Sequence, residues 1–258
     1  MKVREFLNLI DSFAPFDLAE EWDNSGLMVG SYESDVKKIG ITLDPVFEAV
    51  ISASENNCEV LLTHHPLLFR AIKKIDFDSE PGKTISEAVK RNITIISAHT
   101  NWDISEYGVN YVLAKLSGLF EVKNFNSENI GVIGTLKNPL SPEELLTRIK
   151  TSWNLTKLDF YAKNNVKKFF SKIAICGGSG ASFWRAAKNS GADIYITADM
   201  KYHELIDANN SDLPVALADH GEMERATLPE LAGKISESNN NLEAILLNIN
   251  ALNLPIRF

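Results

Sequence analysis

Short apolar runs with strand character alternate with stretches of helical periodicity along most of this chain, and no other feature of the sequence constrains the fold so strongly. Alternation of this kind is typical of α/β proteins, in which helices connect parallel strands. The expected strands are 37–43, 60–63, 93–97, 132–136, 158–162, 173–176, 193–197, 214–217 and 243–249. The expected helices include 3–14, 46–56, 84–91, 107–116, 183–189 and 201–208. We therefore expect an α/β fold with mainly parallel, mixed sheets.

The pattern begins again after a polar segment at 124–129, which suggests that the chain consists of two similar halves. Val60–His65 and Val215–His220 resemble each other, because each is an apolar strand that ends at a histidine. A chain of 258 residues is long enough for two α/β domains of ordinary size. We expect a first half at 1–125 and a second at 126–258, with the C-terminal helix and strand able to pack back on the first half.

Composition and charge exclude several classes of protein. The net charge of −8 argues against general nucleic-acid binding, which normally needs basic clusters. No apolar segment approaches the roughly 20 residues of a membrane span, and the N-terminus does not read as a signal peptide, so we expect a cytoplasmic protein. The two cysteines, Cys58 and Cys176, are too few for a cysteine-based zinc site and are expected in the core.

The histidines stand where ligands gather in α/β proteins. Four of the five lie at the expected carboxyl ends of strands, and His203 lies in the first turns of the helix after another strand. The four are His64, His65, His99 and His220. The carboxyl ends of parallel strands meet at one edge of a sheet, which is where ligands and metals bind. A single histidine is more often a core or surface residue than a ligand, but this joint placement favours a metal site.

Carboxylates follow the same strands. Asp103 lies four residues after His99, Glu224 lies four residues after His220, and Asp199 and Asp219 follow strands as well. A spacing of four lets two side chains meet on one turn. Mixed imidazole and carboxylate donors suit Zn, Fe, Mn, Co or Ni better than Ca or Mg.

The adjacent His64 and His65 are expected to diverge on a straight strand. They can then serve two neighbouring ions, or they converge if Pro66 bends the chain. We favour two ions, and the alternative is a buried polar network without metal.

Two further segments allow a structural and a functional interpretation. The glycine-rich turn at 177–180 is either an anion-binding turn before a helix or a plain tight turn. In the loop at 20–30, Trp22 is interpreted as ordinary packing, and Asp23 and Asn24 as ordinary turn residues.

Six segments in this order resemble the GTP cyclohydrolase 1 type 2 homolog family, also described as the NGG-one-interacting-factor-like family, in the form without the inserted middle domain. They are Trp22–Leu27, Thr63–Pro66, Ala98–Asp103, Cys176–Gly180, Thr197–His203 and Asp219–Glu224. Two positions depart from the family pattern. Ala198 stands where the family usually has glycine, and an extra acidic residue, Glu222, competes with Glu224 as a ligand.

The resemblance implies a site for two divalent metal ions in the cleft between the halves. Its ligands are then His64, His65, Asp103, His220 and Glu224, with His99 and His203 as proton-transfer groups in the same cleft. It also implies a homohexamer. The function implied is a metal-dependent hydrolase that acts on a purine nucleotide such as GTP or on a related substrate. The alternative is a non-catalytic metal-binding, regulatory or partner-binding protein.

Overall fold

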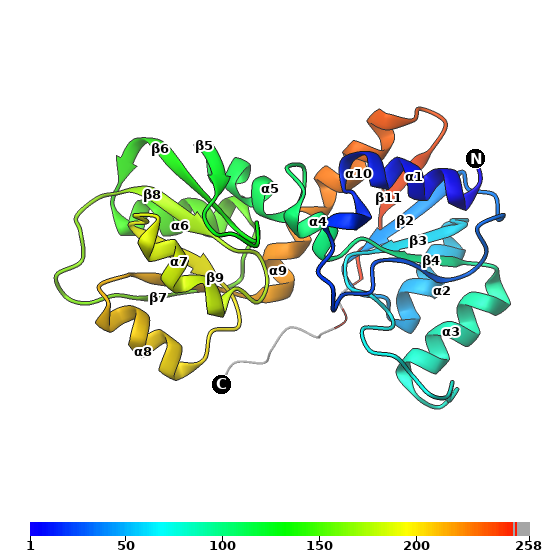
Figure 1. Ribbon diagram of the computed structural model, residues 1–258. Helices are drawn as coiled ribbons and strands as arrows, with labels where there is room; N and C mark the ends of the chain where they lie inside the picture. The colour runs from blue at the N-terminus through cyan, green and yellow to red at the C-terminus, as the bar shows by residue number, and fades with distance from the viewer. Residues whose placement is uncertain (250, 252–258) are drawn as a thin grey trace. The chain divides into compact units, whose positions relative to one another are not determined.

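The computed structural model describes residues 1–249 and 251 of the chain, and it contains two sheets, each covered by helices (Figure 1). The described residues form two compact units. One unit is Met1–Ser105 together with the segment that begins at Leu228, and the other is Glu106–Thr227. The division therefore follows Ser105, whereas the sequence led us to place it near residue 125. Because the pairings are mixed and parallel pairs predominate in the first sheet, the expected α/β fold is confirmed.

The first unit is built on a five-stranded sheet in the order β1-β4-β3-β2-β11. These strands are Gly26–Val29, Thr94–Ser97, Val60–Thr63, Lys38–Thr42 and Glu243–Leu246. The edge strand β1 is antiparallel to β4, and the other pairs are parallel. Every residue of β3 and β4 is buried, which explains why both read as continuous apolar runs.

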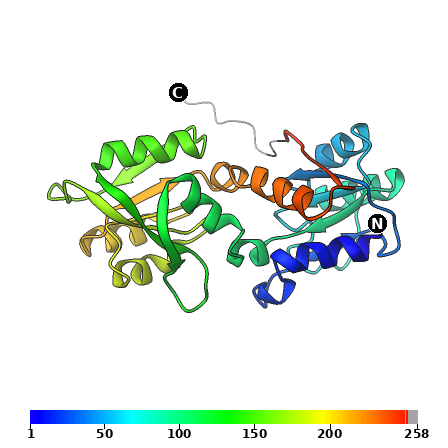
Figure 2. The same cartoon turned by 90° about the horizontal axis from the view of Figure 1, so that it is seen from above.

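Helices cover both faces of this sheet. They are α1 (Val3–Phe13), α2 (Phe47–Glu55), α3 (Glu80–Arg91), α4 (Thr100–Ile104) and α10 (Leu228–Ser238). Seen from above, α1 and α10 lie side by side over the sheet (Figure 2), while α2 and α3 pack on the opposite face. Cys58 is buried in the core between the sheet and α2, and this burial raises the pKa of its thiol to about 11.

The second unit is built on a six-stranded sheet in the order β5-β6-β8-β9-β10-β7. These strands are Leu119–Asn124, Val132–Leu140, Phe170–Ile175, Ile194–Thr197, Val215–Ala218 and Leu158–Tyr161. The three central strands β8, β9 and β10 are parallel, and the pairs on either side of them are antiparallel. Parallel pairing is therefore confined to the centre of this sheet.

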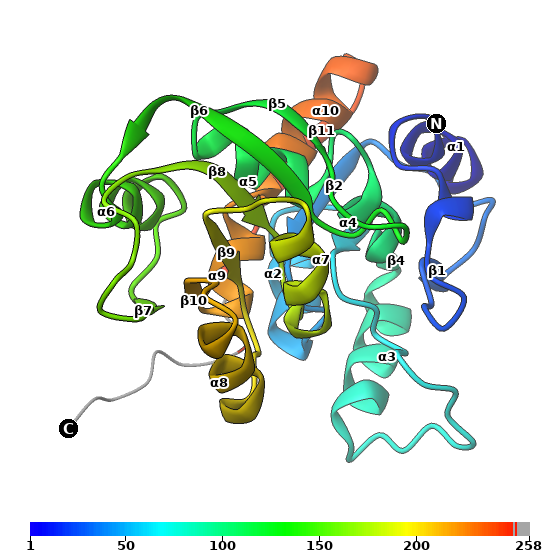
Figure 3. The same ribbon diagram turned by 60° about the vertical axis from the view of Figure 1, so that its left-hand side comes forward.

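The helices of the second unit are α5 (Val109–Leu116), α6 (Pro142–Ser152), α7 (Trp184–Asn189), α8 (Tyr202–Asn210) and α9 (His220–Arg225). Figure 3 shows α6 and α7 on opposite sides of the sheet. Cys176 is buried in the core cluster beneath α7, so the core assignment of both cysteines is confirmed. Within the part of the chain that the structure describes, no helix is long and apolar enough to cross a membrane.

Several short elements were not expected from the sequence, and α4 and β5 are two of them. The short helix α4 follows His99 directly. The edge strand β5 ends at Asn124, where the polar segment that we had expected to link two halves begins. Both elements are short, and neither carries a long periodic pattern.

Candidate metal centre

The strand register of the first unit brings three polar side chains to one edge of the sheet. Thr42 pairs with Thr63, and Thr63 pairs with Ser97, so β2, β3 and β4 end level with one another. Asp44, His65 and His99 each lie two residues beyond these strand ends. Residues 21, 34 and 55 positions apart in the chain are therefore brought to the same edge, and the expected gathering of polar groups at this edge is observed in this unit.

Three histidines form the centre of this edge. The donor atoms that His64, His65 and His99 can offer to a metal ion all lie within 4.8 Å of one another. The ring centroids of His64 and His65 are 5.1 Å apart, and each lies within 5.7 Å of the His99 ring. The strand ends at Thr63, so the divergence expected for neighbours on a straight strand does not apply, and the two rings converge.

Each of these rings is held by its Nδ1 atom. Nδ1 of His64 lies 3.0 Å from the carbonyl oxygen of Ala98, and Nδ1 of His65 lies 2.8 Å from Oδ1 of Asp44. Because these acceptors carry no hydrogen, Nδ1 is the donor, and Nε2 is the nitrogen that a metal ion would bind. Metal-ligating histidines commonly donate the second ring nitrogen to a carboxylate or carbonyl in this way.

Asp103 joins the cluster from helix α4. Its backbone N–H donates to the carbonyl of His99 over 2.9 Å, which forms the single turn that the four-residue spacing predicts. This turn brings Oδ1 of Asp103 to 3.6 Å from Nε2 of His64. A carboxylate oxygen and an imidazole nitrogen at this separation can both reach one cation, so the donor chemistry of the first unit fits a divalent metal.

Asp23 holds His99, a role that the sequence analysis missed when it treated Asp23 as a turn residue. The fully buried Asp23 side chain accepts a 2.7 Å hydrogen bond from Nδ1 of His99 and further bonds from Thr100 and Ser25. Burial alone raises the pKa of this carboxyl. The hydrogen bonds from His99 and Thr100 outweigh burial and hold the pKa well below its ordinary value.

The second unit carries its own pair of donors on helix α9. Nε2 of His220 lies 3.1 Å from Oε1 of Glu224, one helical turn further on, and Nδ1 of His220 lies 2.6 Å from Oδ2 of Asp199. Glu224 is 3% exposed. Burial lowers the pKa of His220, but the two carboxylates outweigh it and raise the pKa to about 9. The two carboxylates therefore favour a positive charge between them, which either the protonated imidazole or a divalent cation can supply.

The glycine-rich turn makes room for this pair. Gly178 has φ +63°, and a Cβ atom at this position would lie 2.4 Å from Oε1 of Glu224. Cβ atoms at Gly177 and Gly180 would lie 2.5 Å from Val109 and from Thr197, respectively. These contacts show a turn required for close packing beside the donors, which accounts for the glycines without a bound anion.

The two departures from the family pattern have structural answers. Glu222 accepts hydrogen bonds from the backbone N–H and the hydroxyl of Thr156, so Glu224 is the residue that contacts His220. Ala198 does not need the left-handed region, because Asp199 adopts it instead, with φ +52°. The left-handed conformation in this turn is therefore adopted by the residue that holds His220.

The structure does not bring every candidate together within its unit. His203 lies on the exposed side of α8, where its ring packs 5.5 Å from that of Tyr202. The described contacts of the His220 ring in this unit are with Asp199 and Glu224. The proposed catalytic role of His203 stays a prediction.

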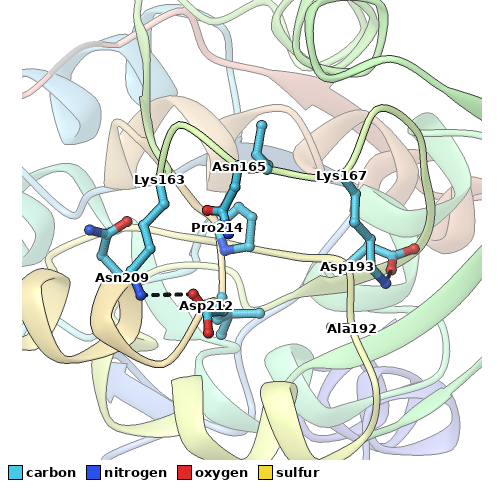
Figure 4. A pocket seen from close by; sticks show the side chains of 10 residues that line it. Lys163, Asn165, Lys167, Ala192, Asp193, Asn209, Asp212 and Pro214 are labelled. Carbon is cyan, nitrogen blue, oxygen red and sulfur yellow. Dashed lines mark hydrogen bonds and ion pairs between the residues drawn. The ribbon is translucent and has the colours of Figure 1, made fainter.

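A separate cavity of about 190 Å³ lies in the second unit, at the amino ends of β9 and β10 (Figure 4). His220 follows the opposite, carboxyl end of β10. The charged side chains of the cavity are already paired. Lys163 lies 2.7 Å from Asp212, and Lys167 lies 2.5 Å from Asp193. The cavity therefore offers no free cluster of metal donors.

The fold and the donor clusters define an α/β protein with two groups of residues suited to a divalent metal. The sequence matches the model of the Duf34/NIF3 (NGG1p interacting factor 3) family over residues 1–252. The chain belongs to this family, and the resemblance stated from the sequence is confirmed.

Several relatives share the same description, "GTP cyclohydrolase 1 type 2 homolog". The one from Clostridium acetobutylicum is 36% identical over 228 residues, which are 85% of this chain and 84% of the relative. The one from Methanocaldococcus jannaschii is 34% identical over 252 residues, or 96% of this chain and 100% of the relative.

Solved structures share the fold. A hypothetical protein from Staphylococcus aureus superposes with a TM-score of 0.90 at 26% identity, over 100% of this chain and 99% of that one. Reduced HcgD from Methanocaldococcus jannaschii superposes with a TM-score of 0.84 at 33% identity, over 96% of this chain and 98% of that one. The likeness therefore extends over nearly the whole length of all three chains.

Proposed function

We propose that this chain is a metal-dependent hydrolase that binds two divalent metal ions. The observation that carries the proposal is shared by four histidines: each has its Nδ1 atom held by a carboxylate or a carbonyl. They are His64, His65, His99 and His220. Fixing one ring nitrogen orients the other for a metal, and no such arrangement is needed for surface histidines.

The proposed ligands are His64, His65 and Asp103 from the first unit and His220 and Glu224 from the second. Support for sharing the ions between the units comes from the sequence resemblance and from the donor set. Imidazole with carboxylate suits Zn, Fe, Mn, Co or Ni. When bound, such ions act as Lewis acids and lower the pKa of coordinated water towards neutrality.

The other residues of the site bind, orient and move protons. We propose that His99 accepts and returns a proton at Nε2, because Asp23 holds Nδ1 and so fixes the ring. His203 is a second proposed proton-transfer group. Substitution of His99 by Gln is expected to lower turnover while the metal content stays at the parental level. Loss of metal from this variant would show instead that His99 is a ligand.

The proposed substrate is a purine nucleotide such as GTP or a related compound. The support is the name of a Helicobacter pylori relative, "GTP cyclohydrolase 1 type 2", which is 31% identical over 226 residues, or 86% of this chain and 87% of that one. In the reaction implied, one water adds at C8 of the purine and the ring opens to leave a formamide, and a second water hydrolyses this formamide to an amine and formate.

The test is the loss of GTP and the release of formate by the metal-loaded protein. We expect His64→Ala and Glu224→Ala to abolish turnover. Glu222→Gln is the matched control, because Glu222 contacts Thr156 and is expected to be dispensable. Turnover that survives both substitutions would contradict the proposed mechanism.

A second candidate function is a metal-binding protein that acts through a partner. The family description, NGG1p interacting factor 3, favours it by naming a protein interaction. Stoichiometric metal without turnover on a panel of purine nucleotides would support this function over the first.

We also propose a homohexamer, which the sequence resemblance supports. Light scattering is expected to give six times the chain mass of 28.7 kDa. A monomer mass at micromolar concentration would contradict it. The cytoplasmic location stays a prediction from the sequence.

A further inference from the structure

Two exposed aromatic rings lie beside the histidine cluster of the first unit. Trp22 is 56% exposed and Phe69 is 48% exposed, and their ring centroids are 5.6 Å apart. Each ring also lies 6.1 Å from the ring of His99. The other three tryptophans of the chain are at most 4% exposed and pack in the core, whereas Trp22 does not. Ordinary packing, the interpretation made from the sequence, does not account for it.

The segments that carry the two rings are fastened to each other and to the cluster. The side-chain amide of Asn24 donates a 2.7 Å hydrogen bond to the carbonyl of Leu68, which joins the two segments that carry the rings. Asp23, which directly follows Trp22, is fixed to His99. Both rings are therefore held near the histidines and are not on independent loops.

The three rings do not stack face to face on one another. The interplanar angle is 54° between Trp22 and Phe69, and it is 77° and 74° between these rings and His99. None of the three contacts is a parallel stack. Exposed aromatic faces bind planar heteroaromatic rings by stacking, and this stacking is tolerant of the identity of the ring.

We propose that Trp22 and Phe69 form an aromatic platform that binds the planar heteroaromatic ring of the substrate, next to His99. The proposal rests on the proposed function and deepens it, since it assigns residues to the recognition of a nucleobase. A ring seated on this platform lies beside the imidazole proposed to move the proton. The platform therefore contributes to affinity for the ring, and it supplies no ligand to the metal ions.

The test is the binding of guanosine, a ring without phosphate, to the full-length, metal-loaded protein. Trp22 is the exposed tryptophan, so its fluorescence should be quenched on binding, and calorimetry gives the affinity. We expect at least tenfold weaker binding for Trp22→Leu and for Phe69→Leu. Trp22→Phe, which keeps a ring, should stay within threefold of the parent. Ribose 5-phosphate, which has no aromatic ring, should bind equally to the parent and the variants.

Phe77→Leu is the matched control, because Phe77 is a 64% exposed ring further along the chain from Phe69. It is expected to bind guanosine like the parent. The metal content of Trp22→Leu should also equal that of the parent, which separates loss of the platform from collapse of the metal site.

Three results would overturn the platform. They are a metal-loaded parent that does not bind guanosine, an unchanged guanosine affinity in both leucine variants, and a Trp22→Leu protein that loses both its metal and its guanosine binding. A change of solution mass in Trp22→Leu with unchanged guanosine affinity would assign the rings to a contact between chains. A parent that binds guanosine through Trp22 but turns over no nucleotide would support the platform and contradict the hydrolase.

Discussion

Single residues outside the proposed set of metal ligands fix the orientation of the histidines in this site. A neutral imidazole has two nitrogens, and a ring fixed by one of them presents the other in a defined direction. Asp44 holds His65 and Asp199 holds His220, at 2.8 and 2.6 Å respectively. Asp199 does so from a left-handed backbone conformation, which a non-glycine residue adopts only where its surroundings compensate the cost.

Replacing these carboxylates should weaken metal binding without removing a ligand. We expect Asp44→Asn and Asp199→Asn each to lower metal affinity by about 10- to 100-fold, because the amide loses the charge that makes the imidazole a stronger donor. Competition with a chromophoric chelator measures the affinity. Asp212→Asn is the control, since Asp212 is 71% exposed and pairs with Lys163. Affinities within twofold of the parent would contradict this role.

Gly178 should be equally sensitive, for a steric reason. A methyl group there would lie 2.4 Å from Oε1 of Glu224, and φ +63° is unfavourable for alanine. Gly178→Ala is therefore expected to displace Glu224, lowering metal affinity at least tenfold and lowering the melting temperature. Gly233→Ala is the matched control, because nothing lies within 4 Å of a Cβ built there. Parental metal affinity in Gly178→Ala would show that Glu224 can move without cost.

At the scale of elements, the buried parallel strands were predictable and the short or exposed ones were not. Strand β3 was predicted with its observed bounds, because all its residues are buried and the segment reads as a continuous apolar run. Strand β5 was missed because it is an irregular edge, with Phe120 58% exposed and Glu121 at φ +52°. Helix α4 has five residues, too few for a periodic pattern.

The same distinction holds for the site. Strand ends were recognisable, so the histidines and the residues that follow them were named from the sequence. The contact between Asp23 and His99 joins residues 76 positions apart and leaves no local pattern. The one available signal was the family segment Trp22–Leu27, whose polar residues were interpreted as turn chemistry.

Helix α6 begins with a capping box. The hydroxyl of Ser141 accepts a hydrogen bond from the backbone N–H of Glu144, and the carboxylate of Glu144 accepts one from the N–H of Ser141. We expect Ser141→Ala to destabilise the protein by about 0.5–2 kcal/mol, whereas Ser141→Asp retains the cap and stays near the parent. Urea denaturation followed by tryptophan fluorescence measures both. Equal losses in the two variants would mean that the cap contributes little.

At the scale of the molecule, the two units repeat one arrangement. In each, three parallel strands are joined by helices, and an antiparallel strand lies beside the last of them, β1 beside β4 and β7 beside β10. In each, a histidine follows that last strand, with a carboxylate four residues later. Neither unit alone contains all five proposed ligands, so the proposed two-metal site requires ligands from both units.

The ratio of metal to protein, measured by elemental analysis of the parent, His64→Ala and Glu224→Ala, tests this requirement most directly, since each substitution lies in a different unit. The account predicts two ions per parental chain and a ratio of one or less in each variant. A parent with fewer than two ions, or a Glu224→Ala protein that keeps both, would contradict it.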